Sequence, residues 1–212
     1  MSKDIKNQST DSLFFSRSNL DNNSVDKIVS NALHKADDGE LFMEFCESES
    51  FVYDDQRLKS ASFDTSKGFG LRAVAGESSG YAHSSDIDEK SLKKASDTVN
   101  FVTKDNNANF NAAFSQTNRK LYNETNPINE TEFSEKVNVL KDIDEYARSK
   151  NTQVKQVSAS LNGEWQAVRI YRPGGIVIED LRPLVRLYIS IVLEKDGRQE
   201  NGSRGSGGRV DY

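Results

Sequence analysis

Cysteine, histidine and proline are scarce in this 212-residue chain, which contains one, two and three of them respectively. The lone cysteine, Cys46, excludes an internal disulfide, and this usage is typical of a reducing compartment. We interpret Cys46 as a small buried hydrophobic residue rather than a reactive thiol. The two histidines, His34 and His83, lie far apart, and neither belongs to a His-Glu-x-x-His pattern. We therefore assign no catalytic, cofactor-binding or metal-ligating residue in this chain.

Long hydrophobic runs are also absent. The N-terminus carries no apolar signal core, and no apolar stretch approaches the roughly 20 residues that a membrane-spanning helix needs. From this and the single cysteine we expect a cytoplasmic protein without a membrane partner.

Positive charge is in deficit, with 28 Lys and Arg against 33 Asp and Glu and a net charge of −5. An acidic chain lacks the cationic surface that phosphate backbones require, so the charge disfavours nucleic acid as the main partner. Arg204 and Arg209 lie among glycines, as in some RNA-binding segments, but two arginines are weak support for that function.

The most regular pattern lies between residues 181 and 208. Apolar and polar residues alternate over 185–193, and Val192 alone interrupts the polar side. A period of two over this length predicts a strand with one face on a core and the other facing water. The sequence at 195–198, which contains Asp-Gly, predicts a turn after it. A glycine-rich run at 202–208 closes the stretch.

Three segments have the apolar periodicity of amphipathic helices. The first covers residues 24–36, with Ser24 as its N-cap. The second begins at the capping-box-like pair Asp86 and Glu89 and ends near residue 104. The third begins near residue 129, with Glu132 in the capping-box position, and ends near residue 149. Its predicted buried stripe comprises Phe133, Val137, Leu140, Ile143 and Ala147.

Strands are predicted between these helices. In the first half we expect a four-stranded meander at 41–53, 57–63, 67–76 and 79–83, with turns at 54–56 and 76–79. In the second half, Asn162-Gly163 is the strongest hairpin signal and predicts a turn between strands at 153–161 and 164–171. A turn at 172–175 and a short strand at 176–178 follow.

These elements predict an α+β fold with two subdomains, each a largely antiparallel sheet packed with one or two helices. The crowded asparagines after residue 104 predict a linker, because their side chains compete with regular backbone pairing. The expected organisation is a flexible N-terminal arm at 1–23, a first subdomain at 24–104, an Asn-rich linker at 105–127, a second subdomain at 128–201 and a Gly-rich segment at 202–212.

Several other residues invite a functional interpretation that we set aside. Gly68-x-Gly70 lacks the third glycine and the Lys-Ser pair of phosphate loops, so a bulge or a close backbone approach explains it better. Trp165 is interpreted as a packing anchor. The remaining carboxylates are predicted to be solvated residues of turns and strand ends, namely Asp37, Asp38, Glu47, Glu49, Asp54 and Asp55.

The sequence nevertheless resembles a known family. The motifs are Leu181-Arg182-Pro183-Leu184-Val185-Arg186-Leu187, Asp196-Gly197-Arg198, Gly202-Ser203 and Gly207-Gly208-Arg209, together with the looser pattern from Gly68 to Ala82. They resemble the TldD/PmbA family, also called modulators of DNA gyrase, over residues 24 to 209. The TldD-like branch is closer than the PmbA-like branch because of residues 182–186.

This resemblance implies the N-terminal, non-catalytic part of a TldD-like zinc metallopeptidase that cleaves unstructured peptides. It places the zinc site, with its His-Glu-x-x-x-His helix, in a half that would follow the glycine run and is not in this chain. The Gly-rich segment would then lead into that half. The implied partner is a PmbA-like subunit or a second copy of the chain.

A different class of function stays open. The chain would then be a stand-alone module that binds peptides or another subunit by strand addition at an exposed sheet edge, without enzymatic activity. Coding sequence that continues beyond Tyr212 into a His-Glu-x-x-x-His helix would favour the peptidase, and an immediate stop codon would favour the module.

Overall fold

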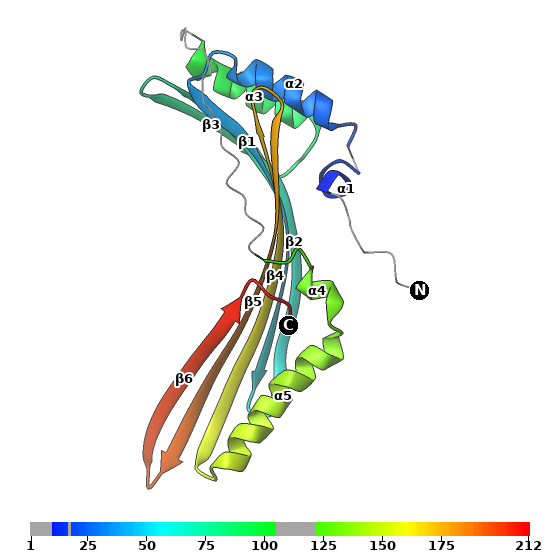
Figure 1. Ribbon diagram of the computed structural model, residues 1–212. Helices are drawn as coiled ribbons and strands as arrows, with labels where there is room; N and C mark the ends of the chain where they lie inside the picture. Colours follow the sequence, from blue (N-terminus) through cyan, green and yellow to red (C-terminus); the bar gives the residue numbers. More distant parts are fainter. Residues whose placement is uncertain (1–9, 17, 105–121) are drawn as a thin grey trace. The chain divides into compact units, whose positions relative to one another are not determined.

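The computed structural model describes residues 10–16, 18–104 and 122–212. Its helices are α1 (Thr10–Phe15), α2 (Asn22–Leu33), α3 (Glu89–Thr103), α4 (Pro127–Glu130) and α5 (Phe133–Lys150). Its strands are β1 (Asp38–Asp54), β2 (Arg57–Ala75), β3 (Ser78–Ser84), β4 (Val154–Arg172), β5 (Ile176–Lys195) and β6 (Arg198–Gly208). The strands form a six-stranded sheet in the order β3-β2-β1-β4-β5-β6 (Figure 1). The predicted α+β class is confirmed.

The four predicted turns at 54–56, 76–79, 172–175 and 195–198 are confirmed, since each lies between two consecutive strands. Their backbones need left-handed conformations, which explains the glycines and acidic residues there. The turn residues with positive φ are Asp55, Gln56, Gly76, Gly174, Gly175, Asp196 and Gly197.

The strands are much longer than predicted. β2, β4 and β5 contain 19, 19 and 20 residues, whereas most strands have about 5–6. The strands expected at 57–63 and 67–76 are both part of β2, so the four-stranded meander is wrong. The short strand expected at 176–178 is likewise the start of β5. Polar residues interrupt the apolar alternation in these strands without ending them.

The predicted hairpin at Asn162-Gly163 is wrong. β4 runs through both residues, and Gly163 does not have a positive φ. Asn162 instead accepts a hydrogen bond on Oδ1 from Ser50 Oγ at 2.8 Å. A Cβ at position 163 would lie 2.8 Å from Cζ of Tyr212. Close packing against this tyrosine, not a turn, requires the glycine.

The chain divides into two compact units that interleave in sequence. The first contains Met1–Phe45, Ser66–Arg119 and Ala167–Asp180, and the second contains Cys46–Thr65, Lys120–Gln166 and Leu181–Tyr212. β1, β2, β4 and β5 each contribute one part to each unit. This division differs from the consecutive segments expected at 24–104 and 128–201, because the long strands pass from one unit into the other.

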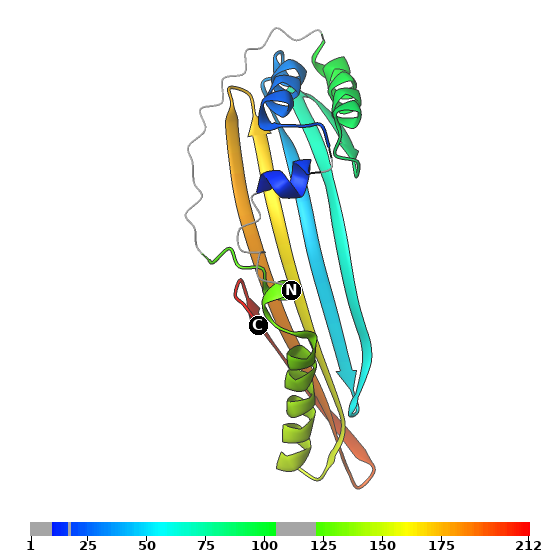
Figure 2. The same cartoon turned by 90° about the vertical axis from the view of Figure 1, so that its right-hand side faces the viewer.

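In the first unit, α2 contacts α3 and α3 contacts β3 (Figure 2). The buried side chains include the apolar stripes of α2 and α3 and one face of the strands: Val25, Val29, Leu33, Leu92, Val99, Leu41, Met43, Leu71 and Ala73. Tyr81 and Ser84 of β3 come close to Gly70 and Gly68, where a Cβ would lie 2.6 Å from Tyr81 Oη and 2.8 Å from the Ser84 carbonyl oxygen, respectively. The predicted close backbone approach is confirmed for Gly68, whereas the close neighbour of Gly70 is a tyrosine side chain.

Helices α2 and α3 of the first unit are capped differently from the prediction. Asp21, not Ser24, is the N-cap of α2. Its Oδ1 accepts a hydrogen bond from the Ser24 amide (2.7 Å), while Ser24 Oγ accepts one from the Asp21 amide (2.9 Å). The N-cap of α3 is Asp88 rather than Asp86. In each case an aspartate close to the predicted position satisfies the first-turn amides.

The described part of the predicted N-terminal arm is folded. Residues 10–15 form α1, whose Phe14 and Phe15 are buried. Arg169 lies over both rings, with its guanidinium carbon 5.8 and 5.4 Å from their centroids. The prediction of a flexible arm at 1–23 is therefore wrong for these residues, because contacts distant in sequence hold them. Residues 1–9 lie outside the described part.

In the second unit, α5 crosses one face of the strands (Figure 2). The core beneath it contains Phe51, Tyr53, Leu140, Ala159, Leu161 and Val185, with Val137, Ile143, Leu187, Ile189 and Tyr212 partly buried against it. Phe133 was expected in the buried stripe but is 55% exposed. Its ring instead meets the edge of Phe51, with centroids 5.5 Å apart. Glu132 is the N-cap of α5, but its side chain makes no capping hydrogen bond.

Trp165 is also part of the second unit and is buried at 6% exposure. Its indole Nε1 donates a hydrogen bond to the carbonyl oxygen of Glu124 at 3.3 Å. The predicted packing role is confirmed.

The glycine-rich run is a strand rather than a separate lead segment. Residues 202–208 belong to β6, which pairs antiparallel with β5 from Lys195↔Arg198 to Val185↔Gly208. The expectation of a separate Gly-rich segment at 202–212 is therefore wrong for residues 202–208. Backbone pairing along an already ordered strand overrides the low β propensity of glycine.

Of the Asn-rich linker expected at 105–127, residues 105–121 lie outside the described residues. From there, Asn126 caps α4 and accepts a hydrogen bond on Oδ1 from the Ile128 amide at 3.0 Å. None of the helices in the described parts of the chain is long and apolar enough to cross a membrane.

Candidate functional site: an apolar groove at a sheet edge

The second unit carries an open, mostly apolar groove of about 890 Å³. One wall is α5, and the other side and the floor are β5 and β6. The main lining residues are Val139, Ile143, Tyr146 and Ala147 of α5, Ile189, Ile191 and Leu193 of β5, and Gly202, Ser203 and Arg204 of β6.

Strand alternation and register explain why this surface is uncovered. Ile189, Ile191 and Leu193 point to the same face as the core residue Val185, because they are separated from it by even numbers of positions. Their partners on β6 are Arg204, Gly202 and Glu200, which supply little apolar cover. α5 covers the strands only partly, and its Val139 and Tyr146 remain 48% and 65% exposed.

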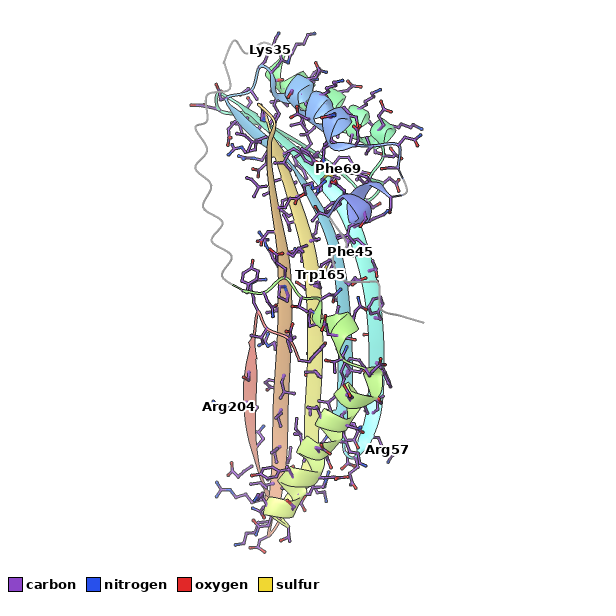
Figure 3. The ribbon with its side chains drawn as sticks, turned by 45° about the vertical axis from the view of Figure 1, so that its right-hand side comes forward. Lys35, Phe45, Arg57, Phe69, Trp165 and Arg204 are labelled. Carbon is purple, nitrogen blue, oxygen red and sulfur yellow. The ribbon has the colours of Figure 1, made fainter. Side chains whose placement is uncertain are left out.

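Charged side chains of both signs border the groove. Asp142 and Lys150 lie on the helix side, and Arg204 lies on the strand side. Lys150 Nζ is 4.8 Å from the centroid of the Tyr146 ring. Arg204 has no hydrogen bond or ion pair among the described residues. Figure 3 labels Arg204 on β6 and Arg57 at the start of β2, on opposite edge strands of the second unit.

A buried ion pair lies in the core of the same unit. Lys136 of α5 and Glu49 of β1 are 2% and 7% exposed, and Nζ lies 2.5 Å from Oε1. Lys136 also donates a hydrogen bond to the Ile128 carbonyl oxygen at 2.8 Å. Tyr212 donates its hydroxyl hydrogen to the same Glu49 oxygen at 2.6 Å, and Lys136 Nζ lies 4.5 Å from the tyrosine ring centroid. Burial, followed by this contact with Glu49, raises the pKa of Tyr212.

This pair corrects the prediction that Glu49 is a solvated turn residue. Glu49 lies inside β1 and is buried. Glu49 already lay inside the strand predicted at 41–53, but its burial depends on a hydrogen bond from Lys136, which is 87 positions away in the sequence. The buried polar groups of Lys136, Glu49 and Tyr212 are hydrogen-bonded to one another or to the backbone. A structural role is therefore sufficient to explain all three side chains.

The first unit has its own buried charge, Arg169, which is 3% exposed. Its guanidinium donates hydrogen bonds to Asp11, Glu179 and Thr10. Burial alone would lower the pKa of Arg169, but hydrogen bonding to Asp11 and the other neighbours raises it. This cluster joins α1 to β4 and β5 within the unit. The sequence did not reveal it, because its members are far apart in the chain.

Three of the other predicted carboxylates have structural partners that are distant in sequence. Asp54 accepts hydrogen bonds from Ser158 and Gln156, which lower its pKa. Asp37 accepts one from the Gly76 amide at 2.6 Å, and Asp38 pairs with Arg172. These contacts stabilise turns and strand ends rather than form an acid–base pair.

The potential metal ligands are not gathered. His34 follows α2, where its Nδ1 is 2.9 Å from the Asn31 carbonyl oxygen, and His83 lies on β3. Cys46 is a half-buried residue of β1 in the other unit. Among the residues that the structure describes, no group of three or more His, Cys, Asp and Glu side chains is placed to hold a metal ion. These donors do not fit a catalytic zinc, which needs three converging protein ligands.

Comparison with known families matches both parts of the chain. Residues 39–99 match the model of PmbA/TldA metallopeptidase domain 1, and residues 126–212 match the model of the PmbA/TldA metallopeptidase central domain. Together these matches cover more than half of the chain.

Individual relatives agree. A metalloprotease TldD homolog from Haemophilus influenzae is 36% identical over 176 residues, which are 82% of this chain and 36% of that protein. A metalloprotease TldD homolog from Buchnera aphidicola subsp. Schizaphis graminum is 28% identical over 84% of this chain and 37% of its own length. The chain thus spans little more than a third of these relatives.

Solved structures show the same fold. A protein named as a modulator of DNA gyrase from Bacteroides thetaiotaomicron superposes with a TM-score of 0.68 at 13% identity, covering 89% of this chain and 45% of that one. TldE from Thermococcus kodakarensis gives a TM-score of 0.63 at 16% identity, covering 88% and 43%.

The class defined by these findings is an α+β region of a metallopeptidase-type protein. The chain belongs to the TldD/PmbA family and corresponds to the N-terminal region of a TldD-like member.

Proposed function

We propose that this chain is the non-catalytic, N-terminal portion of a zinc metallopeptidase that cleaves unstructured peptides. In this function it supplies the scaffold, a wall of the substrate cleft and contacts between subunits. We further propose that it acts in the cytoplasm, as its single half-buried cysteine favours.

One observation carries the proposal. The chain matches the first and central domains of the family, while its described residues bring no metal-ligand cluster together. The buried charges Lys136, Glu49 and Arg169 pair with structural partners inside their own units. The proposed role is consequently one of positioning and contact.

The test is metal analysis of this chain, purified without an affinity tag and dialysed, with a peptide-cleavage assay on the same sample. We expect less than one equivalent of zinc per chain. We also expect no chelator-sensitive cleavage of an unstructured peptide. One equivalent of retained zinc, or chelator-sensitive cleavage, would contradict the proposal.

A binding module without peptidase activity is the second candidate, favoured by the apolar groove beside the open edge of β6. Unlike the peptidase function, this function would require no further domain. Tight binding of an unstructured peptide to this chain, abolished by Ile191→Asp in the groove, would favour the module over a scaffold.

A further inference from the structure

Arg169 lies at a position of β4 where its neighbours are core residues. Ala167, Val168 and Tyr171 are at most 1% exposed, and Arg169 itself is 3% exposed. Among the described residues, five polar side chains from four elements face its guanidinium: Thr10 and Asp11 of α1, Asn22 of α2, Tyr171 of β4 and Glu179 of β5. The contacts of α1 with the strands therefore depend largely on this arginine.

α1 depends on these contacts for its structure. It has six residues, whereas isolated helices shorter than about 12–15 residues are marginal in water. Its three buried residues are Thr10, Phe14 and Phe15. Arg169 contacts each of them, through a hydrogen bond to Thr10 and through the two aromatic rings that its guanidinium faces. One side chain thus holds both the polar and the apolar part of α1.

The two anions that neutralise Arg169 are not buried themselves. The side chains of Asp11 and Glu179 are 53% and 46% exposed. Water and dissolved ions therefore reach both carboxylates, although they do not reach the guanidinium that the carboxylates contact. Exposed carboxylates exchange a protein cation for water or a salt ion at little cost.

We propose that α1 is a releasable strap and that Arg169 is the latch that holds it. In the docked state α1 is helical and covers Arg169. In the released state α1 is unfolded and Arg169 faces water, while α2, α3 and the strands of the same unit stay folded. This inference goes beyond the proposed function and depends neither on zinc nor on peptide cleavage.

Stability alone does not explain an arginine at this position. Burying a guanidinium costs solvation free energy, and apolar side chains of similar volume often stabilise a core as well as an ion cluster does. Docking does not even satisfy the whole group, since the buried Nε of Arg169 has no hydrogen-bond partner among the described residues. The arginine instead favours release, because water solvates the guanidinium once α1 has left.

Acid should release the strap. The hydrogen bond from Arg169 lowers the pKa of Asp11, so the docked state favours the ionised carboxylate. Its contribution to docking is complete above the ordinary aspartate pKa of about 3.9 and is lost as the pH falls through the lower docked pKa. Glu179 is the second carboxylate that faces Arg169, and the other three groups stay uncharged in acid.

The first experiment measures native-state hydrogen exchange of the backbone amides of this chain. It compares about 0.01 M with about 1 M sodium chloride, between which the screening length falls from about 30 Å to about 3 Å. In low salt we expect the amides of α1 to exchange at least about tenfold faster than those of α2, through local opening. High salt should speed the exchange of α1 by a further several-fold and leave α2 unchanged.

Two variants test the latch itself. Arg169→Leu keeps apolar contact with the rings but removes the charge, so α1 should stay protected and its exchange should no longer depend on salt. Asp11→Asn changes only a half-exposed side chain, and it should speed the exchange of α1 several-fold and weaken the salt dependence. Asp97→Asn alters an exposed carboxylate of α3 in the same unit and is the matched control.

Exchange of α1 at the same rate as α2 in both salts would overturn the proposal, because α1 would then be a permanent part of the unit. A salt dependence that persists in Arg169→Leu would overturn the role of the arginine. If Arg169→Leu does not fold, Asp11→Asn decides alone, and unchanged exchange in that variant contradicts the latch.

The second experiment follows the protection of α1 from neutral pH into acid. We expect it to fall below about pH 4 while α2 stays protected, and to fall less in Asp11→Asn. Undiminished protection of α1 well below that pH would refute a carboxylate latch. None of these results affects the metal and cleavage assays of the proposed function.

Discussion

At the scale of single residues, the second unit depends on a charge pair that is almost completely buried. Lys136 and Glu49 are far apart in sequence, and each satisfies a group that would be costly to leave alone in a core. Tyr212 and the Ile128 carbonyl oxygen complete the hydrogen bonds around them. Removing one partner should therefore be much worse than removing both.

We predict that Lys136→Met lowers the free energy of unfolding by about 3–5 kcal/mol, because it leaves the Glu49 carboxylate buried without its cation. The double variant Lys136→Met/Glu49→Leu should recover part of this loss. Urea unfolding measures both. Lys141→Met, on the same helix but in an exposed pair with Glu145, is the control and should cost no more than about 0.5 kcal/mol. Equal losses of unfolding free energy for Lys136→Met and Lys141→Met would show that the buried pair contributes no more to stability than an exposed one.

Gly163 gives a second prediction at this scale. Gly163→Ala should destabilise the chain by roughly 1–3 kcal/mol, because the new methyl group would collide with the Tyr212 ring. In a Tyr212→Ala background the same substitution should cost little or even stabilise, since alanine suits a strand better than glycine. A double-mutant cycle from urea unfolding measures the coupling. A cost independent of Tyr212 would contradict the packing role and return Gly163 to a backbone role.

At the scale of secondary structure, the caps show how short side chains fix helix ends. Asp21 and Ser24 exchange hydrogen bonds at the start of α2. Hydrogen bonds from the Ser24 amide and hydroxyl lower the pKa of Asp21. The folded state therefore favours the ionised carboxylate. Its stabilising effect is complete above the ordinary carboxyl pKa of about 3.9 and is lost as the pH falls through the lower folded pKa.

Asp21→Ala should accordingly lower the urea midpoint at neutral pH, and the difference from the unsubstituted chain should shrink as the pH falls below about 4. Circular dichroism of the helices follows the transition. Asn23→Ala, one position before Ser24 on the exposed side of the same turn, should change the midpoint less. A difference that persists undiminished in acid would mean that the carboxylate is not the capping group.

The helices were predictable from sequence because their information is local. Apolar residues at three- and four-residue intervals located α2, α3 and α5, with errors of up to four residues at their ends. The strands were less predictable, since a local pattern does not reveal that β2, β4 and β5 continue through polar segments. Asn162-Gly163 led to a wrong hairpin prediction for the same reason. The residue pair is typical of a turn, but the glycine is explained here by packing against a tyrosine 49 positions away.

The groove had a partial signal in the sequence. The alternation over 185–193 correctly predicted which side chains share a face, including Ile189, Ile191 and Leu193. It did not show that α5 leaves these side chains partly uncovered, because the placement of a helix depends on contacts between distant segments. The buried pairs of Lys136 and Arg169 gave no signal, since each looks like an ordinary surface charge along the sequence.

At the scale of the whole molecule, the position of Trp165 has a practical consequence for unfolding measurements. It is the only tryptophan of the sequence and belongs to the second unit. Because its indole is buried, its fluorescence emission should shift to longer wavelength when that unit unfolds. The emission would be silent about the first unit, where α2 and α3 lie. A fluorescence melt therefore reports on one unit alone, and a mismatch between it and the far-ultraviolet dichroism of the helices would be the spectroscopic sign that the two units unfold separately.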